Sequence, residues 1–382
     1  MQSAIQHLRL LLSGWDSKHG YCSHREGPAR AHRHHLPALP PPVIDGLRKD
    51  PKPGGYSDSG ADIAFALRQA GHDIVTPQAD PDPADAFAWV FPDTREGLLA
   101  ATEAGANVIW ANTVLFAGHP IEAFLASHWI VGQPPDRQGA VGDKFATNAL
   151  LHAAGLPVAR SVMVAQEESA DAIALSALSP AVLAKQGLAF PLVVKPVRGR
   201  GSQGVSRVAD WPALSDEVAA LFEDALFGDR AIVEQYLAGE ELTLTVLPAQ
   251  AGEGGQPLVL PPVRRFNHAD GIAPYNGTVA VTANSAALTP EECAVQPVER
   301  LMQACADTFV RIGARAAIRI DCRANEQGEY LIFDVNMKPN MTGAGRPGRE
   351  EQDSLSAIAA RALGWSYPDL LAHMLAGAWR NR

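Results

Sequence analysis

The segment AIRIDCRANEQGEYLIFDVNMKPNMTG, residues 317–343, decides the fold of this chain. Its two apolar runs are joined by a polar turn, which predicts an antiparallel β-hairpin. Side chains alternate between the two faces of a strand. This alternation places Arg319 and Asp321 on one face of the first strand, and Asp334 and Asn336 on one face of the second.

The predicted hairpin brings together an arginine, two carboxylates and a carboxamide. Flanking residues such as Ile318 and Ile332 mark both strands as buried, where unpaired carboxylates would cost several kcal/mol. Oxygen ligands of this kind are those that Mg²⁺ prefers, with Mn²⁺ as an alternative. Asp321, Asp334 and Asn336 are therefore predicted metal ligands, in preference to charges on an exposed hairpin.

A second motif is glycine-rich: PLVVKPVRGRGSQGVSRV, residues 191–208. An apolar strand delivers Lys195 to a loop that contains Ser202 among three glycines. Glycines let backbone amides approach phosphate oxygens, and the lysine adds a positive charge. The motif is not a Walker loop, because Lys195 precedes the glycines. Taken alone, the segment fits a phosphate cradle or a hairpin turn with a solvated lysine.

The third motif, IVEQYLAGEELTLTV (residues 232–246), predicts a short strand ending at Glu234 and a second strand from Glu241. An extended segment can bind adenine through backbone N–H and C=O groups, here from Gln235 to Leu237. Carboxylates beside it can accept hydrogen bonds from the exocyclic amine and from the ribose hydroxyls. Two glutamates at a turn more often face solvent, but the neighbouring motifs favour the nucleotide interpretation.

The rest of the chain predicts an α/β fold. Helix and strand patterns over residues 61–112, including a strand at 87–91, predict βα units on a parallel sheet. We expect an N-terminal α/β domain over 1–135, a lid over 136–238 and a C-terminal domain over 239–382.

Composition narrows the partners. The chain has 382 residues and a net charge of −10, without a basic cluster, which argues against nucleic-acid binding. No apolar run reaches the roughly 20 residues of a membrane span. We therefore expect a cytoplasmic protein that binds small molecules, with no nucleic-acid or membrane partner. The four cysteines are expected to be free thiols, and the His- and Pro-rich segment 19–42 a solvated loop without a metal.

The three motifs, in this order and spacing, resemble the ATP-grasp superfamily, and within it the D-alanine:D-alanine ligase-like carboxylate–amine ligases. WVFPDTREG (89–97) and WANTVLFAGHP (110–120) extend the likeness to a little-characterised subgroup. The resemblance implies a pre-ATP-grasp α/β domain followed by a two-part ATP-grasp with a lid. It also implies ATP and Mg²⁺ as cofactors, and an ADP-forming reaction that activates a carboxylate as an acyl phosphate and joins it to an amine.

The resemblance also implies roles for single residues. Arg319 would stabilise the transition state, and Lys195 and Ser202 would assist from the lid. The residues that would bind ATP are Lys144, Lys195, Ser202, Glu234, Gln235, Leu237 and Glu241. The metal ligands would be Asp321, Asp334 and Asn336, with Asp334 standing where the family commonly has glutamate.

Two departures separate this chain from the dipeptide ligases. Those enzymes place a lysine in a mobile loop over the γ-phosphate, whereas residues 267–284 contain none. Arg264, Arg265 or His268 are candidates to replace it. The loop after the metal ligands is arginine-rich, so the substrate pocket is expected to differ. The candidate substrate-binding residues are Arg264, Arg265, His268, Asn340, Thr342 and Arg346.

Three alternatives stay open at this point. The first alternative is D-alanine:D-alanine ligase itself. The second is an ATP-grasp ligase that uses a thiol, hydroxyl or phosphate nucleophile, and the third is a non-catalytic ATP-binding protein. The sequence does not identify the carboxylate or the amine. It also does not decide between a monomer and a homodimer.

Overall fold

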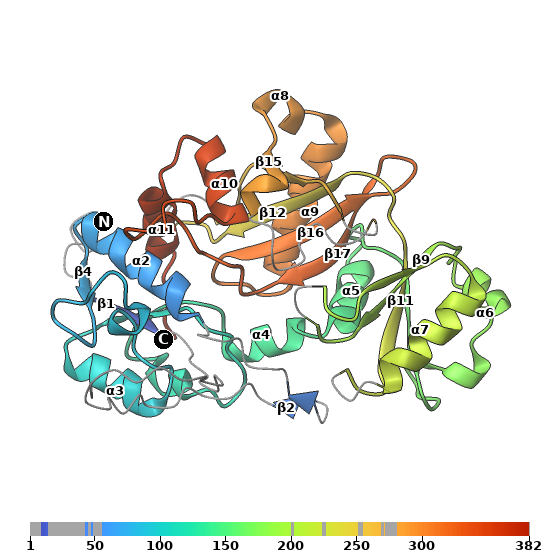
Figure 1. Ribbon diagram of the computed structural model, residues 1–382, viewed down its shortest axis with the longest axis horizontal. Helices are drawn as coiled ribbons and strands as arrows, with labels where there is room; N and C mark the ends of the chain where they lie inside the picture. The colour runs from blue at the N-terminus through green and yellow to red at the C-terminus, as the bar shows by residue number, and fades with distance from the viewer. Residues whose placement is uncertain are drawn as a thin grey trace, which may run out of the picture.

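The computed structural model describes residues 9–13, 43–44, 47–48, 56–199, 202–223, 227–250, 255–268, 271 and 281–381. The His- and Pro-rich segment 19–42 lies outside these residues. Three sheets follow one another along the molecule, and a short hairpin of β2 (Val43–Ile44) and β3 (Leu47–Arg48) lies apart from them (Figure 1).

The N-terminal sheet is parallel, as the sequence predicts. Its strand order is β4 (Asp73–Val75), β1 (Arg9–Ser13), β5 (Val108–Ala111) and β6 (Trp129–Val131). Three helical segments join these strands: α2 (Ser57–Gln69), α3 (Arg95–Glu103) and η2 (Pro120–Phe124).

The strand predicted at residues 87–91 is wrong. The chain forms a 3₁₀ turn, η1 (Ala86–Ala88), because the carboxylate of Asp85 accepts the Phe87 N–H at 3.1 Å. Aspartate side chains compete in this way for N–H groups that a strand ladder would need. Only Phe91 reaches the sheet, where its N–H donates to the Leu12 carbonyl at 2.9 Å.

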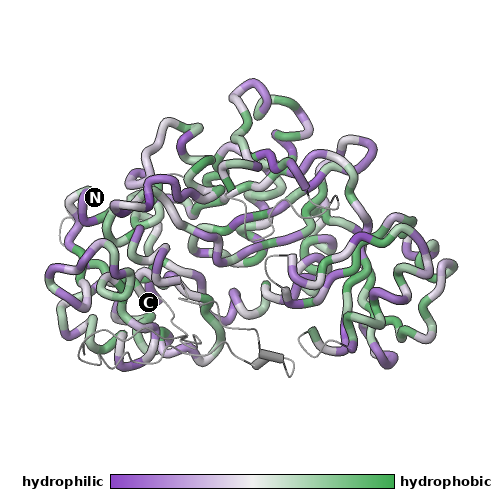
Figure 2. Tube along the Cα trace, viewed as in Figure 1, coloured by the Kyte–Doolittle hydropathy of each residue, from purple (hydrophilic) through white to green (hydrophobic). Residues whose placement is uncertain are grey.

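The lid sheet has the order β10 (Ser206–Val208), β9 (Leu192–Pro196), β11 (Arg230–Gln235), β7 (Ser161–Ala165) and β8 (Ile173–Ala174). One face packs on α7 (Trp211–Glu223) and α6 (Pro180–Lys185) through residues such as Leu192 and Val233. Figure 2 shows β9 and β11 as hydrophobic along most of their length. The opposite face carries Lys195 and Glu234 towards α5 (Lys144–Ala153). The other segments of this part are α4 (Pro135–Val141) and η3 (Leu175–Ala177).

The C-terminal sheet contains the motif that decides the fold. Its order is β15 (Ser285–Ala287), β14 (Val263–Arg265), β12 (Glu241–Leu247), β16 (Ile318–Ala324) and β17 (Tyr330–Asn336), with β13 (Leu258–Val259) beside β12. All its pairs are antiparallel, so the predicted hairpin is confirmed. Helix α9 (Gln296–Arg311) covers one face, where it packs on residues such as Leu244 and Ile320. Two short helical segments, η4 (Val281–Ala283) and α8 (Pro290–Cys293), flank this sheet.

The end of the chain returns to the N-terminal sheet. Helices α10 (Leu355–Ala362) and α11 (Tyr367–Ala376) share one hydrophobic core with Leu10 and Ile63. Trp379 then pairs with Ile130 through backbone hydrogen bonds of 2.6 and 2.9 Å. The N-terminal and C-terminal parts are thus packed through one core. Among the described residues, no helix is both long and apolar enough to cross a membrane.

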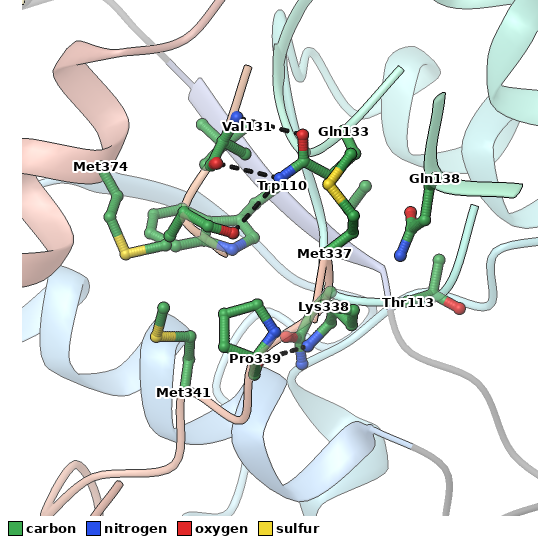
Figure 3. Close-up of a pocket in the computed structure, with 15 residues that line it drawn as sticks. Trp110, Thr113, Val131, Gln133, Gln138, Met337, Lys338, Pro339, Met341 and Met374 are labelled. Carbon is green, nitrogen blue, oxygen red and sulfur yellow. Dashed lines mark hydrogen bonds between the residues drawn. The ribbon is translucent and has the colours of Figure 1, made fainter. Parts of the chain in front are cut away.

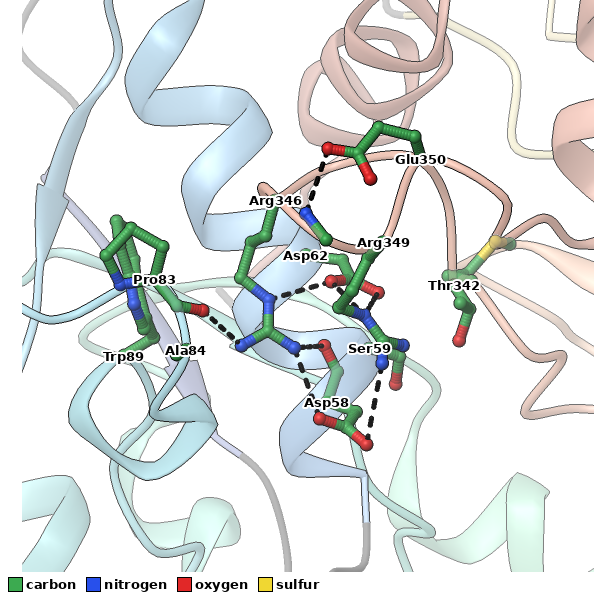
Figure 4. Close-up of polar contacts among 12 residues, drawn as sticks. Asp58, Ser59, Asp62, Pro83, Ala84, Trp89, Thr342, Arg346, Arg349 and Glu350 are labelled. Carbon is green, nitrogen blue, oxygen red and sulfur yellow. Dashed lines mark hydrogen bonds and ion pairs between the residues drawn. The ribbon is translucent and has the colours of Figure 1, made fainter.

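A buried ion-pair network, the arginine clamp, ties the loop after β17 to α2 (Figure 4). Arg346 donates from Nε to Asp62 at 2.8 Å and from Nη1 to the Pro83 carbonyl at 3.0 Å. Arg349 also reaches Asp62, at 2.9 Å, and both arginines approach Asp58. The side chains of Arg346 and Asp62 are only 2% and 0% exposed.

The clamp corrects one expectation about the substrate pocket. Arg346 was predicted to bind substrate, but its guanidinium is buried among protein acceptors. The partner carboxylate lies 284 residues away in the sequence, so no local pattern reveals the pair. We therefore assign Arg346 to the interface between the N-terminal and C-terminal parts.

Arg346→Met is expected to destabilise the protein by about 3–5 kcal/mol, the usual cost of leaving one partner of a buried ion pair alone. Arg349→Met is the matched control, because its side chain is 23% exposed and Asp62 would keep Arg346. Urea unfolding of both variants measures the difference. Equal, small losses of stability would contradict the clamp.

Candidate active site between the lid and the C-terminal sheet

The face of the C-terminal sheet opposite α9 carries the predicted catalytic residues. In the hairpin register, Arg319 lies opposite Asn336, and Asp321 lies opposite Asp334. Strand β12 adds a third row, with Thr243 beside Asp321. The alternation inferred from the sequence therefore holds, and these side chains share one face of the sheet.

The two aspartates on this face are each paired with a cation. Arg319 binds Asp321 through two hydrogen bonds, of 3.1 and 2.9 Å, and Thr243 donates to the same carboxylate at 2.8 Å. Asp334 is bound by Lys144, the first residue of α5. Burial raises the pKa of Asp334, but Lys144, with Lys195 and Arg319, outweighs burial and leaves this pKa below its ordinary value. Asp334 is therefore held in the charged form.

The lid contributes a second buried pair. Lys195 Nζ lies 2.6 Å from Glu234 Oε1, and it also donates to the Phe333 carbonyl on β17 at 3.1 Å. Asn148 of α5 approaches the other oxygen of Glu234 at 3.4 Å. Burial raises the pKa of Glu234, although Lys195 acts against this effect. Lys195 thus links the lid sheet to the hairpin that carries the two aspartates.

The residues predicted to bind metal fit a hard divalent cation. Asp321 and Asp334 face each other across one strand pair, and Asn336 adds an amide oxygen that also accepts the Lys338 N–H at 2.9 Å. In the described ranges, no group of three or more His, Cys, Asp or Glu side chains is arranged to hold a metal ion. Two carboxylates and an amide suit Mg²⁺, which usually retains water and phosphate oxygens in its shell.

The residues predicted to bind ATP lie on both sides of the junction between the sheets. Gln235 ends β11, and Leu237 is buried in the connection to β12, outside both ladders. Glu241 is buried and lies 2.8 Å from His268 Nε2. Ser202 is exposed in the β9–β10 connection, with a positive φ of 61° that L residues rarely adopt. The nucleotide roles of these residues remain predictions.

The predicted substrate residues do not all reach this face. Arg264 pairs in register with Leu242, whose side chain packs towards α9, and it binds Glu240 and Glu292. Strand alternation therefore places Arg264 on the face that α9 covers, away from the site, and its neighbour Arg265 on the site face. Asn340 accepts hydrogen bonds from Thr342 in a turn of the loop after β17.

A small pocket opens beside this face (Figure 3). It lies where β5 and β6 end, next to Trp110 and Val131, and it reaches Ala317 before β16. Lys338 and Gln133 contribute polar groups. The apolar lining includes three methionines: Met337, Met341 and Met374. Ligands bind α/β sheets at the carboxyl ends of their strands, so this pocket is a candidate substrate subsite.

Sequence reasoning missed two polar residues of the site. Asn148 lies one helical turn after Lys144 and faces the same way, so helix periodicity could have identified it. Thr243 lies two residues after Glu241, and strand alternation could have placed it on the same face. The pocket residues carried no comparable signal, because they come from strands and loops far apart in the sequence.

Solved structures share the fold of this chain. The D-alanine–D-alanine ligase from Bacillus anthracis, complexed with ATP, matches with a TM-score of 0.59 at 20% identity, over 84% of this chain and 91% of that one. The VanG D-Ala:D-Ser ligase from Enterococcus faecalis matches with a TM-score of 0.58 at 17% identity, over 83% and 94% of the two chains. The fold is that of these D-alanine ligase structures, which confirms the predicted fold class.

The sequence comparisons then identify the family. The model described as D-ala D-ala ligase C-terminus matches residues 150–376, and the chain belongs to this family. It is 32% identical to the D-alanine–D-alanine ligase of Haemophilus influenzae over 238 residues, which are 61% of this chain and 69% of that protein. The Bifidobacterium adolescentis enzyme is 27% identical, and the match spans 62% of each chain. The resemblance seen in the sequence is thereby confirmed, and the predicted ligase class agrees with it.

Lys195→Met is expected to lower stability by about 3–5 kcal/mol, because it leaves the buried Glu234 carboxylate without its cation. If Lys195 only bound phosphate, the same substitution would leave the stability of the fold unchanged. The double variant Lys195→Met/Glu234→Gln removes both charges and should regain most of the stability. Thermal unfolding of the three proteins measures this recovery. A single variant as stable as the parent would rule out the buried pair.

Proposed function

We propose that this protein is an ATP-dependent, ADP-forming ligase that activates a carboxylate as an acyl phosphate and couples it to an amine. The observation that carries the proposal is that Lys144 and Arg319 bind the carboxylates Asp334 and Asp321, which lie opposite each other, while Lys195 binds the neighbouring Phe333 carbonyl. Such a site can hold a metal–triphosphate complex, whose charge needs both metal ligands and cations.

The residues divide the work according to their positions. Lys144 and Lys195 would bind phosphate oxygens from the lid side. Asp321, Asp334 and Asn336 would hold Mg²⁺, which spreads the negative charge of the reacting phosphates when bound. The backbone from Gln235 to Leu237 would contact adenine, and the Glu241 carboxylate would accept hydrogen bonds from the ribose hydroxyls.

The chemistry itself requires no side-chain nucleophile. A substrate carboxylate oxygen attacks the γ-phosphorus of ATP, and ADP leaves with the electrons of the broken P–O bond. The amine then attacks the acyl carbon and loses a proton, and inorganic phosphate leaves with the former carboxylate oxygen. Arg319 would stabilise the oxyanion formed in this second step, because its planar guanidinium offers two parallel donors.

The methionine-lined pocket supports an assignment for the acyl substrate. It lies beside the start of β16, which carries Arg319, and beside the loop that follows Asn336. We assign the apolar part of the carboxylate substrate to this pocket. Flexible methionine side chains adapt to different apolar groups, and Lys338 adds a cation near the pocket.

The relatives named above are D-alanine–D-alanine ligases, so pairs of small D-amino acids are the first substrates to test. A non-catalytic ATP-binding protein is disfavoured because Arg319, Asp321 and Asp334 are all retained on one face of the hairpin, with Lys144 and Lys195 contacting it. The decisive screen measures ADP release with ATP, Mg²⁺ and pairs of amino acids or small carboxylates. Release that no acid–amine pair stimulates would contradict the ligase proposal.

Arg319→Lys tests the catalytic arginine. In the structure this residue also neutralises Asp321, and lysine would preserve that charge. A catalytic role predicts a 10²–10³-fold loss of ligation rate, the order lost when an oxyanion donor is removed, with ATP affinity retained. The control is Arg311→Lys on the exposed surface of α9. Near-parental ligation by Arg319→Lys would leave Arg319 with a neutralising role only.

Ala317→Leu tests the pocket, because Ala317 is 4% exposed and forms part of its wall. The added side chain should fill the pocket and reduce kcat/KM by about 10-fold or more for acids with large apolar groups. Acids the size of glycine should be affected least. An equal reduction for small and large acids would place the acyl group elsewhere.

A further inference from the structure

Arg265 is a buried arginine whose role the fold does not explain. It ends β14, is 7% exposed, and lies beside Glu241 in the strand register. Its Nε and Nη2 groups are buried, and neither has a hydrogen-bond partner among the residues that the structure describes. An arginine cannot escape such a position by losing its proton, because its pKa is far above neutral. The guanidinium therefore has unused donors that an anion can satisfy.

The carboxylates near Arg265 are already engaged. Glu241 contacts His268 at 2.8 Å, and Asp321 accepts three hydrogen bonds, from Arg319 and Thr243. Burial lowers the pKa of Arg265, while Asp321 and Glu241 act in the opposite direction. These carboxylates lie close enough to influence Arg265 but do not pair with it. A buried charge in this situation costs several kcal/mol unless a partner arrives.

The position of Arg265 indicates which anion can reach it. Glu241 lies next to it on β12, and Asp321 lies on β16, one strand beyond β12. Asp321 acts more strongly than Glu241 on the charge of Arg265, so the guanidinium leans across β12 towards the Asp321–Asp334 pair, where the phosphates of a nucleotide with its ribose at Glu241 would lie. Planar guanidinium groups bind phosphate oxygens through two parallel hydrogen bonds.

We infer that Arg265 binds the terminal phosphoryl group of ATP, and the acyl phosphate formed from it. This inference rests on the ligase function proposed above. It assigns to a rigid strand the contact that a mobile-loop lysine provides in the dipeptide ligases. It also distinguishes Arg265 from its neighbour Arg264, which is satisfied by Glu240 and Glu292 on the opposite face.

The test compares the affinities of ATP and ADP, each with Mg²⁺, by isothermal titration calorimetry. Arg265→Met should raise the Kd for ATP by about 10- to 100-fold, the range expected when one hydrogen bond to a charged group is lost. The Kd for ADP should stay within about twofold, because ADP lacks the γ-phosphate. The matched control Arg264→Met should leave the ATP-to-ADP affinity ratio unchanged.

Stability without nucleotide separates this role from a structural one. Because Arg265 has unused buried donors, Arg265→Met should unfold at the parental temperature or above it. If Arg265 had a structural role, the same substitution would lower the unfolding temperature. If Arg265→Met does not fold, Arg265→Lys replaces it in the same titrations and should lower the ATP-to-ADP affinity ratio by about 10-fold.

The outcomes distinguish this inference from the proposed function. A folded Arg265 variant with the parental ATP-to-ADP affinity ratio overturns the inference, while ligation by the parent leaves the proposed function intact. Equal weakening of ATP and ADP also overturns it, because the γ-phosphate is then not the group bound. A parent protein that binds neither nucleotide instead contradicts the proposed function.

Discussion

The organising constraint of this protein is that two carboxylates, the buried Asp321 and the partly buried Asp334, lie opposite each other on one hairpin. Asp321 and Asp334 share a strand pair in a sheet that is covered by α9 on its other face. Two like charges opposite each other on adjacent strands destabilise the fold unless cations accompany them. The cations that pair with them are Lys144 of α5 and Arg319 of the hairpin, and Lys195 of the lid strand β9 adds positive charge beside Asp334 while it pairs with Glu234. The same requirement therefore holds the lid against the C-terminal sheet and assembles a site for a metal–phosphate complex.

The other parts of the fold position this centre. The chain returns after the hairpin through a loop that the arginine clamp fixes to α2, and α10 and α11 complete a core shared with the N-terminal sheet. The pocket beside the site exists because of this packing, since its walls come from both parts. Substrate selection in such an arrangement depends on contacts between distant segments, whereas the phosphate chemistry depends on the hairpin and the lid.

Much of this could be predicted from the sequence. The period-two pattern of the hairpin placed Arg319, Asp321, Asp334 and Asn336 on common faces, because alternation is a local property of a strand. Alternation also places Arg264 and Arg265 on opposite faces of β14. The sequence does not tell which of them faces the site, because a three-residue strand is too short to show a hydrophobic face. The turn at Ala86–Ala88 was missed because Asp85 captures the N–H of Phe87. The partners of Arg346 and the pocket required the tertiary structure, because the segments that form them are far apart in the sequence.

The central claim is that ATP activates a carboxylate as an acyl phosphate at this site. Its most direct test uses an acid that supports turnover, labelled with ¹⁸O in both carboxylate oxygens, with ATP, Mg²⁺ and the amine. Attack of the carboxylate on the γ-phosphorus transfers one of its oxygens to phosphate. The account predicts that mass spectrometry finds one ¹⁸O atom in the inorganic phosphate for each bond formed. Unlabelled phosphate, released at the same rate as the product, would contradict it.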